Sequence, residues 1–161
     1  CGRGDSSLEL SELFPSSKVM GMDFSGEMLK LSSLSIQQNK NIKFVQGNFV
    51  KMPFIEKTFD LVVCIGVTCC IHPNDIEKAI SELARVTKGS IVIEIKNKLT
   101  LFYLFRKLEP IINKSKFTVY GNTAMQMERQ MSKYGFKLAK IAPVFKFNFT
   151  SPNIILRFTR R

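Results

Sequence analysis

The 161-residue sequence lacks any apolar run of the roughly 18 residues that a membrane-spanning helix needs, and its start lacks the basic-then-apolar layout of a signal peptide. Cysteine is scarce, because only Cys1, Cys64, Cys69 and Cys70 are present and none has C-x-x-C spacing. The only histidine is His72. We therefore expect no disulfide framework, no metal site and a protein of the reducing cytoplasm.

Acidic residues are scarce in the second half of the chain. Residues 1–87 contain 9 Lys and Arg against 10 Asp and Glu, whereas residues 88–161 contain 15 against 3, so the net charge of +11 comes from the second half. Such an excess suits an anionic small molecule, an RNA or a membrane surface, and it also suits a solvated basic face with no specific partner.

The length and a hydrophobic content of 45% predict one globular domain over residues 1–161. Apolar runs at 18–24, 42–49, 60–66 and 90–95 have the character of buried parallel strands. Helical spacing of apolar residues or helix-ending signals mark 6–13, 26–38, 75–87 and 123–134. Two further strand-like runs, 136–147 and 153–158, follow with Ser151 to Asn153 as the turn between them.

This alternation predicts an α/β fold of the Rossmann-like, doubly wound type. We expect a mostly parallel sheet with helices on both faces and an antiparallel pair of strands that closes it near the C-terminus. In such folds a ligand lies at the carboxyl ends of the strands.

A glycine turn opens the chain at Gly2-x-Gly4, and Asp23 ends a predicted strand 19 positions after Gly4. In nucleotide-binding folds this turn brings the backbone close to the ligand, and a strand-ending acid holds the ribose hydroxyls. A diphosphate cofactor would favour a third glycine, but Ser7 occupies that position, and Asp5 adds a negative charge to the first helical turn. S-adenosylmethionine (SAM) has no phosphate and fits better, while an NAD(P)-linked oxidoreductase stays open as an alternative.

Four blocks of sequence resemble the class I SAM-dependent methyltransferases, in particular those that methylate small molecules. The blocks are CGRGD, VMGMDFSGEML, IKFVQGNFVKMPFIEKTFDLVVCIG and EKAISELARVTKGSIVIEI. By this resemblance Gly2 and Gly4 pass close to the methionine part of the cofactor, Asp23 holds the ribose and Phe24 packs on the adenine.

The resemblance also implies that Asn48 and Phe49 contact the adenine edge, and that Cys64 and Ile65 line the cofactor. Asn48 stands where the family usually has Asp, which keeps an acceptor but removes a charge. The turn TKGS is shorter than the usual Lys-Pro-Gly-Gly turn.

The family pattern begins with an apolar strand and an acid-x-glycine, neither of which precedes Cys1. We therefore expect the sequence to be truncated within the first motif and to lack the first, central strand of the sheet. Residues 1–95 are then the cofactor-binding half, and residues 96–161 the acceptor-side and sheet-closing half.

Methyl transfer from a sulfonium mainly requires the acceptor to be held in line, with a base only if the acceptor must lose a proton. His72, which follows the apolar strand at 60–66, is a candidate general base, with a loop or capping role as the alternative. Cys69 and Cys70 lack the preceding Pro-Cys motif of covalent RNA cytosine methyltransferases, and the Asn/Asp-Pro-Pro-aromatic motif of amino-methylating nucleic-acid enzymes is missing. Nucleic acid is thus a disfavoured acceptor.

The expected acceptor is a small molecule, apolar or anionic. The stretch LTLFYLFRKLEPIINKSK combines apolar bulk with Arg106, Lys107, Lys114 and Lys116, as a lid, an interfacial helix in peripheral contact with a membrane, or a helix packed on the sheet would. A non-enzymatic module that binds RNA or a membrane surface through the basic half remains a further alternative.

Overall fold

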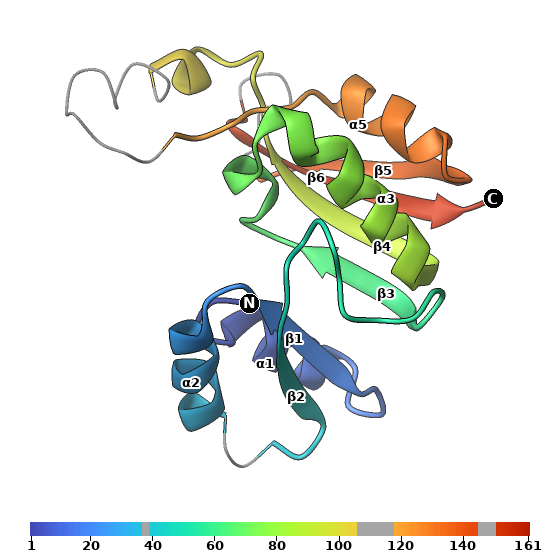
Figure 1. The fold of residues 1–161 in the computed structure, drawn as a ribbon. Coiled ribbons are helices and arrows are strands. Elements are labelled where there is room, and N and C mark those ends of the chain that lie inside the picture. The colour runs from blue at the N-terminus through green and yellow to red at the C-terminus, as the bar shows by residue number, and fades with distance from the viewer. Residues whose placement is uncertain (37–38, 106–117, 145–150) are drawn as a thin grey trace. The chain divides into compact units, whose positions relative to one another are not determined.

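The computed structural model describes residues 1–36, 39–105, 118–144 and 151–161, and these divide into two compact units (Figure 1). The first unit is Cys1–Pro53 and the second is Phe54–Arg161. Each unit is described by itself below.

The described residues of the first unit form two helices and two parallel strands. Its elements in chain order are α1 (Asp5–Leu13), β1 (Val19–Asp23), α2 (Gly26–Ser35) and β2 (Ile42–Gln46). Val19 of β1 lies opposite Ile42 of β2, and Asp23 lies opposite Gln46. The helix α2 begins where the sequence favours it, because the Ser25 side chain accepts a hydrogen bond from the Met28 N–H.

Two glycines allow close packing in the first unit. A Cβ on Gly21 of β1 would lie 2.6 Å from Cδ1 of Phe44 and 3.0 Å from Oγ of Ser7. Only glycine at this position therefore allows both the Phe44 ring and the helix α1 to pack this close to β1. Gly4 precedes α1 with φ of 92°, and a Cβ there would lie 2.6 Å from Cδ1 of Ile36. The Gly2-x-Gly4 turn therefore has a packing reason for Gly4 that is independent of any ligand.

The described residues of the second unit form four strands and two longer helices. Its elements are β3 (Phe59–Cys64), the 3-10 turns η1 (Thr68–Cys70) and η2 (Pro73–Asp75), α3 (Ile76–Val86), β4 (Thr87–Lys96), α5 (Ala124–Ser132), β5 (Phe136–Pro143) and β6 (Asn153–Arg160). Residues 101–105 are also helical. The strand order is β3-β4-β6-β5, with β3 parallel to β4 and β6 antiparallel to both of its neighbours.

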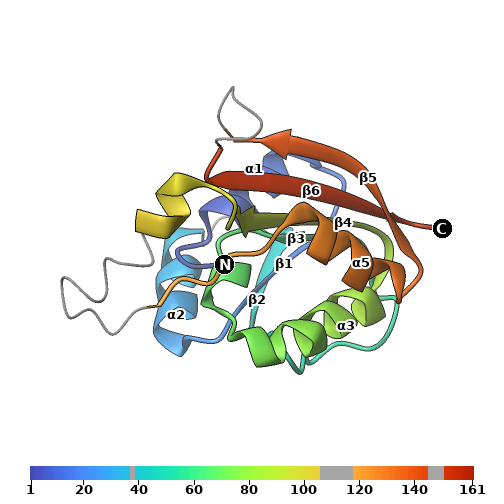
Figure 2. The ribbon, with the colours of Figure 1, turned by 90° about the horizontal axis from the view of Figure 1, so that it is seen from above.

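The core of the second unit lies between its sheet and the helices α3 and α5, which lie side by side on one face (Figure 2). The predicted stripe of α3 is buried at Ala79, Ile80, Leu83 and Val86. Every second residue of β4, namely Ile91, Ile93 and Ile95, is fully buried, as the period of a strand requires. The Thr123 hydroxyl and the Gln126 side chain form a capping box that begins α5.

The predicted α/β alternation and the antiparallel closing strands are confirmed. The described strands form two sheets, because β1 pairs only with β2, and β3 pairs only with β4. Several element boundaries differ from prediction by a few residues; for example, β4 begins at Thr87, directly after α3. Asn153 was predicted both as part of the turn and as the start of the strand-like run 153–158. It is the first residue of β6, pairs with Lys96 and accepts a hydrogen bond from the Lys96 ammonium at 3.0 Å.

No helix within the described ranges is long and apolar enough to cross a membrane. Residues 106–116 of the basic stretch predicted as a lid, an interfacial helix or a packed helix lie outside the described residues, and so do the last three residues of the strand-like run 136–147.

Candidate functional site

Asp23, the last residue of β1, is the centre of a hydrogen-bond cluster in the first unit. Its Oδ2 accepts from the Cys1 α-amino group and from the Gly2 N–H, both at 2.8 Å, and its Oδ1 accepts from the Ser25 N–H at 3.0 Å. The carboxylate thereby links the glycine turn to the start of α2. The predicted contacts of Gly2 and Gly4 with the methionine part and of Asp23 with the ribose stay predictions.

The surroundings of Asp23 keep it ionised. Partial burial by itself would raise the pKa of this carboxyl, but the hydrogen bonds that it accepts, among them those from the Ser25 and Gly2 N–H groups, outweigh burial and lower the pKa. Asp23 therefore carries a full negative charge at neutral pH, as an acceptor for two ribose hydroxyls would require.

The glycine turn and Phe24 flank this carboxylate. Gly2 and Gly4 both have positive φ, 55° and 92°, and the Gly4 carbonyl accepts from the N–H groups of Ser7 and Leu8 at the start of α1. Phe24, next to Asp23, has 74% of its surface exposed. An exposed aromatic ring beside an ionised strand-ending carboxylate offers a flat apolar face and a hydroxyl acceptor together.

Asn48 and Phe49 lie in the turn that follows β2. The Asn48 Oδ1 accepts from the Val50 N–H at 3.0 Å, and its backbone carbonyl accepts from the Lys51 N–H at 3.0 Å. The side-chain oxygen thus stabilises the turn, and the exposed NH2 group remains for a ligand. The predicted adenine contact of Asn48 and Phe49 stays a prediction.

Cys64 ends β3 in the second unit, and Ile65 follows it. Cys64 is buried, and burial together with the nearby Cys69 and Glu94 raises its pKa to about 12, so its thiol is neutral. Ile65 is about half exposed, at 48%. Only Ile65 of this pair is thus accessible to a ligand within the second unit.

Glu94 of β4 was missed by sequence reasoning, although it fixes the loop after β3. Its Oε2 accepts from the Gly66 N–H at 2.9 Å, and its backbone carbonyl accepts from the Thr68 hydroxyl at 2.7 Å. Its Oε1 pairs with the Lys96 ammonium at 3.4 Å. An acid inside the otherwise apolar run SIVIEI was the available signal, because a charge in a largely buried strand needs a partner.

His72 lies in the same loop region, as the cap of η2. Its Nδ1 accepts from the Asn74 N–H at 3.3 Å, and its ring meets the Tyr120 ring edge-on with centroids 5.5 Å apart. Nδ1 is thus occupied as the acceptor of this cap. This geometry favours the capping alternative over the general base.

The four cysteines are free thiols, and no group of three His, Cys, Asp or Glu residues that could hold a metal ion occurs within the described ranges. Cys69 is buried, and burial followed by the neighbouring Cys70 raises its pKa to about 11. Cys70 is exposed.

A glycine turn before a helix, a strand-ending acid, and a parallel sheet closed by an antiparallel pair define the class I SAM-dependent methyltransferase fold. The sequence matches the family described as "Methyltransferase domain" over residues 1–90, and the chain belongs to this family. S-adenosylmethionine is the cofactor of the family, which resolves the question between SAM and NAD(P) raised by Gly2, Gly4 and Asp23.

Two curated relatives are demethylmenaquinone methyltransferases. The protein from Lactococcus lactis subsp. lactis (strain IL1403) is 42% identical over 91 residues, covering 55% of this chain and 35% of the relative. The protein from Geobacillus stearothermophilus is 34% identical over 112 residues, covering 67% of this chain and 47% of the relative. The chain thus spans about a third to a half of the length of these relatives.

Solved structures show the same fold at low sequence identity. The magnesium protoporphyrin IX methyltransferase from Synechocystis PCC 6803 with bound SAH aligns with a TM-score of 0.79 at 20% identity, covering 100% of this chain and 71% of that one. A SAM-dependent methyltransferase from Methanosarcina mazei gives a TM-score of 0.79 at 18% identity, covering 99% of this chain and 89% of that one.

Proposed function

We propose that the chain contributes to an enzyme that transfers a methyl group from SAM to a small apolar acceptor by in-line displacement. The observation that carries the proposal is the ionised Asp23 carboxylate, held between the glycine turn and α2 beside the exposed Phe24 ring. The names of the two relatives support an acceptor of the demethylmenaquinone type.

The residues of the first unit fit the adenosine part of SAM. Asp23 has lone pairs beyond its three hydrogen bonds and a full charge, which suits ribose hydroxyls, and Phe24 has an open ring face, which suits adenine. When bound, SAM supplies a methyl group already activated by a sulfonium. The protein then has to hold the acceptor in line with that methyl and exclude competing nucleophiles.

The second unit would supply the acceptor side. Leu99, Leu101, Phe102, Leu104 and Phe105 are each more than half exposed. Tyr103 lies between them and points the other way, because its hydroxyl accepts from the Gly121 N–H at 2.9 Å. This tether leaves five apolar side chains available for an apolar acceptor.

Peripheral contact with a membrane surface is a second candidate role for the same five side chains, since exposed apolar residues beside cations suit a lipid interface. Sedimentation with phosphatidylglycerol vesicles tests it. Replacing Leu101 and Phe105 by Ser should release the protein from the vesicles, and equal sedimentation of the variant would remove this role.

Titration of the intact protein with SAM tests the cofactor site. Asp23→Ala should weaken binding by about 1.5–3 kcal/mol, the scale of hydrogen bonds to a charged group. Asp60→Ala, which removes an exposed acid of the second unit, is the matched control and should bind SAM as the parent does. Equal affinity of the Asp23 variant would remove Asp23 from the site.

Incubation with methyl-labelled SAM and demethylmenaquinone tests the acceptor. Label in the quinone product supports the proposal. If the protein binds SAM but, in a cell extract, transfers label only to polar products, the proposal of an apolar acceptor is overturned.

His72→Ala should retain turnover if His72 is a cap. A loss of turnover with unchanged SAM affinity would restore it as a base.

A further inference from the structure

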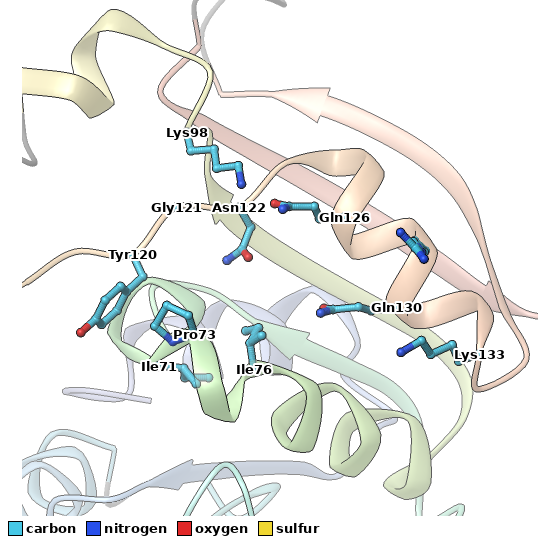
Figure 3. A pocket seen from close by; sticks show the side chains of 11 residues that line it. Ile71, Pro73, Ile76, Lys98, Tyr120, Gly121, Asn122, Gln126, Gln130 and Lys133 are labelled. Carbon is cyan, nitrogen blue, oxygen red and sulfur yellow. The ribbon is translucent and has the colours of Figure 1, made fainter.

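A groove of about 490 Å³ lies within the second unit, between α5 and the segment formed by η2 and the start of α3 (Figure 3). One wall is apolar and consists of Ile71, Pro73 and Ile76. The α5 side carries Gln126, Arg129, Gln130 and Lys133, and Lys98 closes one end. An apolar wall therefore faces a row of amides and cations.

The cations of this groove are only partly neutralised. Lys133 is paired with Glu77, whose carboxylate oxygen lies 2.6 Å from Nζ. In the part of the chain that the structure describes, Lys98 and Arg129 have no carboxylate within ion-pair distance. Two positive charges thus border the groove without an internal counter-charge, and an anion between them would gain from both.

Gln130 adds a polar group to the same side of the groove. Its Oε1 is buried and has no hydrogen-bond partner among the described residues, so this oxygen is not the atom that a ligand in the groove would meet. The NH2 group of the same amide can donate a hydrogen bond to an anion.

We infer that this groove binds a small organic anion, in which a carboxylate or phosphate group is attached to an apolar body. The anionic group would lie between Lys98 and Arg129 and accept from the Gln130 amide, and the apolar body would lie on Pro73 and Ile76. The groove borders the His72 loop, since Ile71 and Pro73 flank His72 and Tyr120 contacts it. The inference is independent of the proposed methyl transfer, because it concerns binding alone.

Titration of the intact protein, followed by NMR at the Gly121 amide and the Gln130 side-chain amide, tests the site. The probes are phenyl phosphate, which has both features, inorganic phosphate, which lacks the apolar body, and benzyl alcohol, which lacks the charge. We expect saturable shifts with phenyl phosphate and clearly weaker binding of the other two.

Three variants separate a specific site from the general basic charge. Arg129→Gln and Lys98→Gln should each weaken phenyl phosphate binding about tenfold, the lower end of the range for a charged hydrogen bond. Lys137→Gln removes one exposed cation of β5 outside the groove and should leave the affinity unchanged. All three positions are exposed, so these variants should fold.

Several outcomes would overturn the inference. If Lys137→Gln weakened phenyl phosphate binding as much as the groove variants do, only the net charge of the protein would matter. If benzyl alcohol bound as tightly as phenyl phosphate, the charge of the ligand would not contribute to binding. If inorganic phosphate bound as tightly as phenyl phosphate, the apolar wall would not contribute to binding. If millimolar phenyl phosphate gave no saturable shifts, the groove would not be a binding site.

Discussion

The two units follow the same α/β pattern but differ in how much apolar surface they bury. Among the described residues of the first unit, only Ile42 and Met52 are buried apolar side chains, whereas Leu13 and Phe24 are more than 70% exposed. In the second unit the central residues of β4 and β6 are fully buried, for example Ile93 and Phe158. The second unit therefore has an apolar core, and the first has almost none.

The difference follows from strand pairing. A two-stranded sheet covered by two short helices encloses little volume, while β4 and β6 each have neighbours on both sides. The first unit is ordered instead by hydrogen bonds, around Asp23 and between the Asn39 amide and the Ser11 hydroxyl at 2.9 Å. The same alternation of elements thus yields one unit stabilised by packing and one by polar contacts.

The sharpest test of this comparison is truncation of an apolar side chain in each unit. Phe158→Ala in β6 should cost about 3–5 kcal/mol of unfolding free energy, because it empties a fully buried ring site. Leu31→Ala in α2, at a position 46% exposed, should cost much less. Urea unfolding followed by circular dichroism measures both, and equal losses would contradict a core confined to the second unit.

Backbone geometry should be the weak point of the first unit. Gly4→Ala adds a Cβ that meets Ile36 and forces alanine into left-handed backbone, so we expect a loss of about 2–4 kcal/mol. Gly2→Ala also has positive φ but no atom within 4 Å of its Cβ, and should cost about 1–2 kcal/mol. If the two variants unfold at the same urea concentration, the packing at Gly4 is not what stabilises the turn.

The second unit has one partly buried and one exposed acid–lysine pair, and removing the acid should cost more stability in the first than in the second. Glu94→Ala leaves the Gly66 N–H without an acceptor and the partly buried Lys96 without its carboxylate, so it should cost about 1–3 kcal/mol and speed amide exchange at Gly66. Asp60→Ala breaks the exposed pair with Lys88 and should cost at most about 1 kcal/mol. Unchanged exchange at Gly66 would mean that Glu94 does not fix the loop.

The smallest effect should be an acid transition of Asp23. Because the pKa of the folded carboxyl is lowered below its ordinary value of 3.8, the stability from this carboxylate is complete above pH 3.8 and is lost as the pH falls through the lowered pKa. Carbon-13 NMR of the Asp23 carboxyl should give a midpoint below 3.8. An ordinary midpoint would show that the Gly2 and Ser25 contacts are not maintained, and Asp23→Asn should remove the transition.

Local pattern was enough to predict most elements. The apolar spacing of residues 75–87 predicted α3, and the apolar run 18–24 predicted the strand that ends at Asp23. Both follow from short-range rules of helix period and of strand–turn–helix units, which need no knowledge of distant contacts.

The features that the sequence did not predict depend on contacts between residues far apart in the chain. Glu94 contacts Gly66 across 28 positions, and Lys98 borders the same groove as Arg129 although 31 positions separate them. The helical and strand periodicity of the sequence does not predict such long-range contacts. The capping role of His72 depends on a loop conformation that the string CCIHPND does not specify.

The strand order β4-β6-β5 places a late segment of the chain inside the sheet. During synthesis on the ribosome β4 emerges well before β6. Until β6 is made, the backbone groups along one edge of β4 have no strand to pair with, because the partner strand lies far along the chain. Lys96 of β4, for example, pairs with Asn153 of β6, 57 positions later. β5 and β6 can first pair with each other as a hairpin, but they add to β4 only when β6 is complete. Vectorial folding of the second unit is therefore delayed until its last strand arrives, and the nascent chain passes through a stage in which chaperones would find an open strand edge.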